Sequence, residues 1–236
     1  MAKAEKRPSG RREGTLSRER IIEASIELLD EAGEEGLTFR TLSERLKTGP
    51  GALYWHIADK NDLLGAACDT IVARTLAKAV VTTPDATIRA VALHIFDLID
   101  QHPWVGAALT SVPGLSPIVR ILEPIGKQIR VLAIPAEQQW KAVGTLMAYI
   151  LGVSTQNAAN GQLARRRGLD RSEFLEAVSD SWSQLSPYDY PFARSVAAIL
   201  RDHDDRADFA AGIDLILDGI HARRKHPPER RSRAST

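Results

Sequence analysis

The stretch Leu37-Thr-Phe-Arg-Thr-Leu-Ser-Glu-Arg-Leu-Lys-Thr-Gly-Pro-Gly-Ala-Leu-Tyr-Trp-His-Ile57 decides the fold of the N-terminal part of the chain. Thr38 is a suitable N-cap for a short helix ending near Leu46, because its hydroxyl can accept from free backbone N–H groups. Gly49-Pro50 then begins a further helix, expected to reach Ile57, since proline is tolerated in a first helical turn. The expected inward face consists of Leu42, Leu46, Leu53 and Ile57. This spacing predicts a helix-turn-helix motif.

Amphipathic helices are predicted on both sides of this motif. Apolar residues recur with a period near that of a helix between Ser17, a suitable N-cap, and Gly33, a suitable C-cap. Asp59 caps a longer connecting helix that is expected to run to Val80. The motif therefore belongs to a small helical head that continues into a connecting helix.

The rest of the chain also shows helical patterns, separated mostly by prolines, and no part of it alternates apolar and polar residues as a strand would. The predicted fold class is therefore all-α. We expect a basic flexible arm at 1–16 and a helix-turn-helix domain with its connecting helix at 17–82. A larger helical body follows at 83–222, and a basic disordered tail at 223–236.

Composition and cysteine content are those of an ordinary globular protein of a reducing compartment. The chain has 236 residues, of which 44% are hydrophobic and 26% charged. A single cysteine, Cys68, excludes a disulfide framework and a cysteine-based zinc site. The uncharged window 142–164 has a polar second half, which leaves too few apolar residues for a membrane span. The charged N-terminus lacks the apolar segment of a secretion signal, so a cytoplasmic protein without membrane contact is expected.

The formal net charge of +1 conceals basic ends on an acidic body. Residues 1–20 carry seven Lys or Arg against three Glu, and residues 223–236 carry six Lys or Arg against one Glu. Basic ends favour contact with a polyanion, although such tails also occur as solvated, disordered segments.

A helix-turn-helix motif places its second helix in the DNA major groove and braces it with the first. In this chain, small residues at the front of the second helix permit close approach of the backbone, and an aromatic and an imidazole side chain follow them. Lys60, at the start of the connecting helix, is expected to face a phosphate. The residues expected toward the groove are Pro50, Gly51, Ala52, Tyr54 and His56.

The pattern Thr38-x-Arg40-x-Leu42 … Leu53-Tyr54-Trp55-His56 … Lys60-x-x-Leu63-Leu64 resembles the DNA-binding head of the tetracycline-repressor (TetR) family. The resemblance is strongest over residues 17–66. His102-Pro103-Trp104 and the closing segment 208–219 look like the C-terminal domain found near the tetracycline repressor itself. The resemblance implies a homodimeric transcriptional repressor that binds a palindromic operator in double-stranded DNA and is released by a small-molecule effector.

The resemblance also implies roles for individual residues of the head. Thr38 and Arg40 would lie near the DNA at the start of the bracing helix, with Arg40 as the guanine reader, because its guanidinium can donate two hydrogen bonds to guanine. Trp55 would be a structural residue anchored in the core. The residues implied to contact mainly the DNA backbone are Tyr54, His56 and Lys60.

Two further features of the head concern the turn and the arm. Lys47 stands where the family usually carries glycine, so a strained left-handed backbone or a different turn is expected there. Arg11 and Arg12, in the basic arm, are hypothesised to lie in an adjacent minor groove.

Helix-turn-helix proteins usually bind DNA as dimers, because one head reads few base pairs. The helices expected at 136–166 and 205–222 carry stripes of small or apolar residues, and the resemblance pairs these helices with their mates in a four-helix bundle. The alternative is that both stripes pack within one subunit. The expected interface residues are Ala148, Gly152, Ala159, Phe209, Ile213, Ile216, Leu217 and Ile220.

The family's effector pocket lies in the body, and a largely apolar effector is expected for this chain. The candidate lining mixes apolar and polar groups, as small-molecule sites do, but each residue is also a candidate for ordinary core. The candidates are His94, Phe96, Trp104, Leu109, Val112, Ile118, Leu122, Trp140, Met147, Tyr149, Gln156 and Asn157. Tetracycline-responsive members use histidine to bind a magnesium-chelated drug, and the corresponding loop at 107–113 contains none. We therefore expect no response to a magnesium–tetracycline chelate.

One acidic motif raises an enzymatic alternative. Asp204-Asp205-Arg-Ala-Asp208 matches the magnesium-binding D-D-x-x-D pattern of isoprenoid-diphosphate enzymes. The same acids precede the last helix, where they are natural N-terminal caps, and no second magnesium motif is present in the sequence. We therefore expect no enzyme, no metal site and no cofactor. The other class of function left open is an all-α binding protein whose head contacts a protein.

Overall fold

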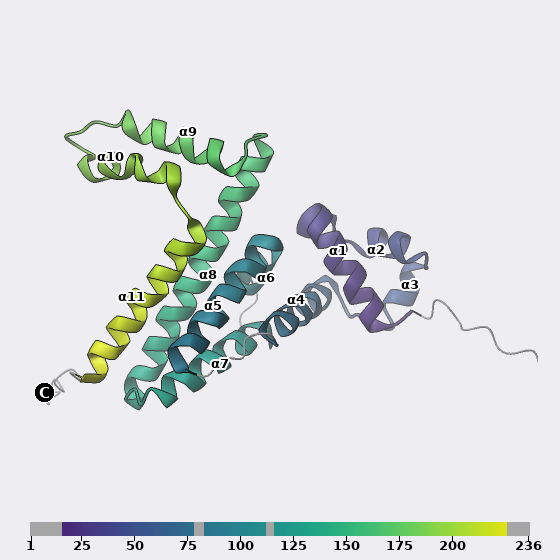
Figure 1. Ribbon diagram of the computed structural model, residues 1–236. Coiled ribbons are helices and arrows are strands. Elements are labelled where there is room, and N and C mark those ends of the chain that lie inside the picture. The colour runs from purple at the N-terminus through teal and green to yellow at the C-terminus, as the bar shows by residue number, and fades with distance from the viewer. Residues whose placement is uncertain (1–15, 78–82, 112–115, 226–236) are drawn as a thin grey trace, which may run out of the picture. The chain divides into compact units, whose positions relative to one another are not determined.

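The computed structural model describes residues 16–77, 83–111 and 116–225, and within these ranges the chain is helical with no strand (Figure 1). The prediction of an all-α fold is therefore confirmed. Contacts divide the chain into two compact units, Met1–Ala67 and Cys68–Thr236. The division falls inside a helix, whereas the sequence analysis placed the domain boundary after residue 82. The described helices of the first unit are α1 (Arg18–Gly36), α2 (Phe39–Leu46), α3 (Pro50–Leu53) and the beginning of α4 (Lys60–Leu76).

In the first unit, here called the head, α1, α2 and α4 begin at the capping residues that the sequence predicts. The Ser17 hydroxyl accepts from the backbone N–H of Arg20 at 3.3 Å, and the Asp59 carboxylate accepts from that of Asp62 at 2.8 Å. Thr38 forms a reciprocal capping box with Thr41. Gly33 takes a positive φ of 65°, and α1 resumes for one more turn beyond this kink. Local capping chemistry therefore determines where these helices begin.

Apolar residues from all four helices form the core of the head. Of the expected inward set, Leu42, Leu53 and Ile57 are buried, while Leu46 is only half-buried. Removing these side chains from water is the main stabilising contribution, at roughly 25 cal/mol per Å² of apolar surface. The other large side chains of this core are Ile21, Leu29, Leu37 and Leu63.

The second unit, here called the body, contains the end of α4 and all later helices. Its long helix α8 runs beside α5 and α11, and the pair α9 and α10 projects from the far end of α8 before α11 returns along it (Figure 1). Pro124 lies inside α7 as expected. The described elements are α5 (Pro84–Gln101), α6 (Trp104–Ser111), α7 (Ser116–Val131), α8 (Ala136–Arg166), α9 (Arg171–Ser183), α10 (Pro191–Ala197), a 3₁₀ turn (Ile199–Asp202) and α11 (Asp205–Lys225).

Helix α5 is central to the body because it packs against α6, α7, α8 and α11. Its residues Ile88, Ile95 and Ile99 are fully buried, as expected for a helix covered on several sides. Cys68 is also buried, and burial raises the pKa of its thiol to about 12, so the thiol stays protonated at neutral pH. None of the helices in the described ranges has the length and apolar character needed to cross a bilayer.

Candidate nucleic-acid interface and ligand groove

The turn between α2 and α3 is held by an unusual backbone conformation. Lys47 adopts φ 53° and ψ 47°, so the first of the two expected alternatives, a strained left-handed backbone, is the one present, and its N–H donates to the carbonyl of Glu44 at 3.2 Å. A lysine in this region carries a steric cost that glycine would not. Ser43 is buried beside it and donates to the carbonyl of Arg40 at 2.8 Å. Hydrogen bonds to carbonyl groups of α2 therefore hold the turn in this conformation, without a glycine at Lys47.

Helix α3 is shorter than predicted. It ends at Leu53, and the segment to His56 is a hydrogen-bonded turn instead of the expected helix to Ile57. The carbonyl of Leu53 accepts from both His56 and Ile57, at 2.9 and 3.0 Å, which closes this turn. Its N-cap, Gly49, has no side chain to cap the helix, and Gly51 lowers helix propensity, so a single helical turn is all that forms.

Trp55 is 89% exposed, so the prediction that it anchors the core of the head is wrong. Leu53 and Ile57 point inward, and a residue midway between them on a helical turn points to the opposite side. Tyr54 is also exposed, but its ring stacks on Phe39 with centroids 4.5 Å apart and planes 6° apart. The exposed Tyr54-Trp55 pair therefore stands on an aromatic support from the start of α2. No sequence signal indicated Phe39, because the stack joins two separate helices.

A hydrogen-bond network that the sequence did not reveal holds the turn carrying His56. Arg18, from the first turn of α1, donates to the His56 carbonyl at 2.5 Å and to Asp62 Oδ1 at 2.9 Å. Asp62 Oδ2 accepts from the backbone N–H of Ala58 at 3.0 Å. The Arg18 guanidinium and, second, the Ala58 N–H hold the pKa of Asp62 below its usual value. The network therefore holds the backbone of this turn at two points, the His56 carbonyl and the Ala58 N–H.

The two cations expected at DNA have acceptors inside the head. Arg40 is exposed and pairs with Glu44 one turn along α2, with Nε and Oε1 3.0 Å apart. Lys60 donates to the backbone carbonyl of Glu34 at 2.6 Å, and its Nζ lies 3.9 Å from the Glu34 carboxylate. A phosphate or base would have to replace these acceptors. Arg11 and Arg12 lie outside the described residues.

The residues expected toward the DNA groove show mixed exposure. Pro50 and Gly51 are exposed at the start of α3, and Thr38 is exposed at the start of α2. Ala52 and His56 are half-buried. The structure therefore brings the start of α3 and the Tyr54-Trp55 turn to the head surface, while Ala52 and His56 present only part of their side chains.

In the body, four of the twelve effector candidates line one groove of about 350 Å³: Phe96, Tyr149, Gln156 and Asn157. This is here called the aromatic groove. Its floor is a stack in which Phe209 lies 4.6 Å from Phe96 and 5.5 Å from Tyr149 between ring centroids. The Tyr149 hydroxyl donates to the Phe209 carbonyl at 3.3 Å, and burial, then the Asp208 carboxylate, raises the pKa of this phenol. A mostly apolar floor is typical of a small-molecule site.

Polar groups also line the aromatic groove. His203 bridges two carboxylates, with Nδ1 2.8 Å from Asp208 and Nε2 3.1 Å from Asp205. Asn157 donates to Asp100 at 3.1 Å, and Gln156 donates to Asn160 at 3.0 Å. His203 was missed in the sequence, although the neighbouring acidic motif marked the segment. These groups can orient a ligand by hydrogen bonds.

The remaining effector candidates are dispersed, and they do not line the aromatic groove. Trp104, Leu109 and Met147 are buried, which matches the alternative of ordinary core. Trp140 is exposed and does not line the aromatic groove, and its place in the effector pocket stays a prediction. Val112 lies outside the described residues. The half-buried candidates are His94, Ile118 and Leu122, and the buried Nδ1 of His94 has no hydrogen-bond partner among the described residues.

The acidic motif caps α11, as the sequence favoured. Asp204 accepts from the backbone N–H groups of Arg206 and Ala207, both at 3.0 Å. Asp205 and Asp208 are held by His203. Within the described ranges, no group of three or more acidic, histidine or cysteine side chains is arranged to hold a metal ion.

The predicted dimer interface is partly wrong. On α11, the apolar stripe packs inside the same chain, because α11 contacts both α5 and α8, so these residues are not available to a partner. On α8, the small residues Ala148, Gly152 and Ala159 are exposed, and Ile216 of α11 is half-buried. Leu215, 74% exposed, marks the outer face of α11 instead. The four predicted interface residues that are buried in the subunit are Phe209, Ile213, Leu217 and Ile220.

Comparisons with known proteins cover both units. The model of the family described as "Bacterial regulatory proteins, tetR family" matches residues 21–67, and that described as "Tetracyclin repressor-like, C-terminal domain" matches residues 85–224. Among solved structures, the transcriptional regulator SCO7222, a TetR from Streptomyces coelicolor, is 48% identical with a TM-score of 0.79, covering 88% of this chain and 99% of that one.

Sequence relatives agree with the family models. The HTH-type transcriptional repressor DrrR1 of Streptomyces coeruleorubidus is 27% identical over 219 residues, covering 91% of this chain and 81% of the relative. The class D tetracycline repressor protein from Escherichia coli is 46% identical over 59 residues, which cover 25% of this chain and 27% of the repressor. With both parts of the chain matched by its models, the protein belongs to the tetR family of bacterial regulatory proteins.

Proposed function

We propose that the protein is a homodimeric transcriptional repressor that binds a palindromic operator and is released by a small-molecule effector. The exposed turn Tyr54-Trp55 carries the proposal. Trp55 is nearly fully exposed, so its ring does not stabilise the core of the head, and the neighbouring Tyr54 ring is held at the surface by its stack on Phe39. Large exposed aromatic groups of this kind are characteristic of binding surfaces. Arg40 lies on the exposed side of α2, where its guanidinium is available to a guanine once it leaves Glu44.

A dimer is proposed because one head reads too few base pairs for a specific operator. In such complexes the two reading helices lie about 34–36 Å apart, one turn of DNA. The exposed small residues of α8, together with Leu215 of α11, form the proposed seam. Small side chains allow close helix approach, and an exposed leucine supplies apolar area to bury.

Release by an effector is proposed to act through the aromatic groove. A ligand that binds one body conformation better than another shifts the population toward it, and the coupling between ligand and DNA is reciprocal, about 1–3 kcal/mol in typical cases. Helix α4 is the proposed transmitting element, because residues of this one helix belong to both units. The expectation that a magnesium–tetracycline chelate is not an effector stays a prediction.

The test begins with a selection of duplexes from a random library and continues with titrations by fluorescence anisotropy. Arg40→Ala should weaken binding to the selected operator about 5- to 150-fold and remove the preference for one guanine, since a bidentate contact contributes about 1–3 kcal/mol. Arg166→Ala is the matched control, because Arg166 is an exposed arginine at the C-terminal end of α8, in the body rather than in the head. A chain that selects no sequence, or an Arg40→Ala variant that binds normally, contradicts the proposal.

A further inference from the structure

The segment that joins α9 to α10 carries three exposed aromatic side chains within five residues, here called the tip aromatics. Tyr188 is 94% exposed, Phe192 is 78% exposed and Tyr190 is 53% exposed. Because a large aromatic side chain has about 150–250 Å² of surface to bury, the three together present roughly 350–550 Å² to solvent. This much exposed aromatic surface on one short segment is characteristic of an interaction site.

Hydrogen bonds hold this segment within the arm, the name used here for α9, α10 and the 3₁₀ turn that follows them. The Arg194 guanidinium donates to the backbone carbonyls of Ser183 and Leu185, with a distance of 2.7 Å to Leu185. These carbonyls lie at the end of α9, where a helix leaves acceptors without partners. The Tyr190 N–H donates to the Ser186 carbonyl at 2.9 Å. The tip aromatics therefore stand on a pre-organised segment, which lowers the entropy cost of binding.

The described part of the body does not cover the tip aromatics. Helices α9 and α10 pack mainly against each other and the 3₁₀ turn, and the arm joins the rest of the body at the end of α8. The arm projects from this end, and its tip points away from α5, α6 and α7 (Figure 1). The buried side chains of the arm are Phe174, Leu175, Ser179 and Ala197. Its small core thus leaves the aromatic rings of the tip outside.

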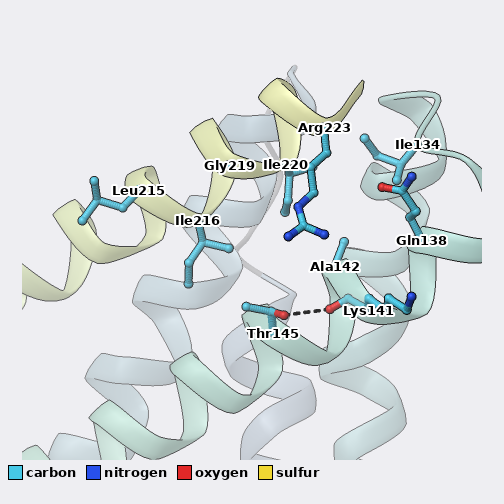
Figure 2. Close-up of a pocket in the computed structure, with 10 residues that line it drawn as sticks. All are labelled: Ile134, Gln138, Lys141, Ala142, Thr145, Leu215, Ile216, Gly219, Ile220 and Arg223. Carbon is cyan, nitrogen blue, oxygen red and sulfur yellow. Dashed lines mark hydrogen bonds between the residues drawn. The ribbon is translucent and has the colours of Figure 1, made fainter. Parts of the chain in front are cut away.

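The face of α8 and α11 proposed as the dimer seam supplies little apolar area of its own. Its exposed residues on α8 are small, and a groove of about 280 Å³ hollows the face between the start of α8 and the end of α11 (Figure 2). Leu215 points away from α8, whereas Ile216 points toward it (Figure 2). A stable interface buries about 800 Å² on each subunit, which is more than these small side chains supply.

We infer that the tip aromatics dock on the body of a second copy of this chain, so that each arm of the homodimer reaches over the partner. The arm begins where α8 ends and stops where α11 begins, so it is continuous with the proposed seam. Two-fold symmetry makes the same contact twice, and the tip aromatics then provide about half of the area that each subunit needs. The inference rests on the homodimer of the proposed function.

Charge and composition disfavour other occupants. Residues 171–202 carry three arginines against five Asp or Glu, so DNA phosphates and anionic lipids would be repelled. The chain's own residues 226–236 contain no large apolar side chain that could cover aromatic rings. A second copy of the chain offers apolar surface beside the seam, and it is the occupant that these observations favour.

The experiment measures the dimer dissociation constant of the full chain by analytical ultracentrifugation. Tyr188→Ser and Phe192→Ser should each raise this constant about tenfold or more, because aromatic anchors contribute a large share of binding energy at interfaces. Both residues are exposed in the single chain, so circular dichroism should show unchanged helix content. Val119→Ser is the matched control, because Val119 is an exposed apolar residue on α7, outside the arm, and should leave the constant unchanged.

Hydroxyl-radical footprinting of the wild type provides a second readout. Tyr188 and Phe192 should be protected above the dissociation constant and reactive below it, whereas Trp55, exposed in the head, should be reactive at both concentrations. A wild-type dimer whose constant neither variant changes would overturn the inference and leave the homodimer intact. A wild type that is monomeric at every concentration would overturn the homodimer of the proposed function as well. Flotation with phosphatidylcholine vesicles that is lost in Tyr188→Ser, with an unchanged dimer, would assign the tip to a lipid surface instead.

Discussion

Replacing Phe209 with alanine tests whether the apolar stripe of α11 belongs to the core of one subunit. Phe209 is 1% exposed and stacks on both Phe96 and Tyr149. Truncating a buried phenylalanine costs about 3–5 kcal/mol, and two aromatic contacts place this site toward the upper half of that range. We expect a loss of about 4 kcal/mol in the free energy of unfolding, which lowers Tm by roughly 8–16 °C for a domain of this size.

The assay is differential scanning calorimetry at several protein concentrations, together with sedimentation for the dimer dissociation constant. A core defect lowers Tm at every concentration, whereas a seam defect makes Tm more dependent on concentration by mass action. Leu215→Ala is the matched control on the same helix: with Leu215 exposed, subunit stability should change by less than about 0.5 kcal/mol while the dimer weakens. If Phe209→Ala left Tm nearly unchanged and instead dissociated the dimer, the assignment of Phe209 to the core would be refuted.

Three further changes test the local physics. Lys47→Gly should stabilise the head by about 1 kcal/mol, because glycine adopts φ 53° without the clash of a Cβ, and urea unfolding would detect no gain if the turn were relaxed. Asp62→Asn should lower the free energy of unfolding by about 1 kcal/mol at neutral pH, since the ion pair of Arg18 with Asp62 that it removes is partly exposed. Because the pKa of Asp62 is lowered in the folded protein, its carboxylate stabilises the fold above the unfolded-state pKa, and this stabilisation is lost as pH falls through the folded-state pKa. Wild type and variant should therefore converge in stability as pH falls below the ordinary pKa of an aspartate, and a constant difference across that range would contradict the network. Gly212→Ala should lower the free energy of unfolding by about 1–3 kcal/mol, because an added Cβ would lie 1.8 Å from the Tyr149 hydroxyl oxygen. Gly144→Ala is the control and should be tolerated, because an added Cβ there has no atom within 4 Å. Equal thermal stability of the two variants would argue against close packing at Gly212.

Helix boundaries were largely predictable because their causes are local. Ser17, Thr38 and Asp59 each cap the helix that the sequence assigned to them, and the left-handed Lys47 follows from its position after α2. The length of α3 was not predictable in the same way. The helix ends where the Leu53 carbonyl accepts from the N–H groups of both His56 and Ile57, and no residue type in this segment predicts that arrangement.

The candidate sites depend on contacts between distant segments, and there prediction was weaker. Trp55 and Phe209 are both large aromatic residues on helical stripes, yet one is exposed and the other is buried. Periodicity identifies an apolar face but not which neighbour covers it. The network of Arg18 with Asp62 and the stack of Phe209 on Tyr149 join residues far apart in the chain, so neither could be found from spacing alone.

The pairing of Arg40 with Glu44 and of Lys60 with the end of α1 has a consequence for how the protein searches a chromosome. In the proposed DNA complex, the Glu44 carboxylate and the Glu34 carbonyl compete with DNA for these two cations, and this competition lowers the affinity for DNA of arbitrary sequence. At the proposed operator, base contacts would compensate for the exchange of partners. The internal acceptors would therefore shorten the time that the proposed repressor spends on other DNA and increase the ratio of its operator affinity to its non-specific affinity.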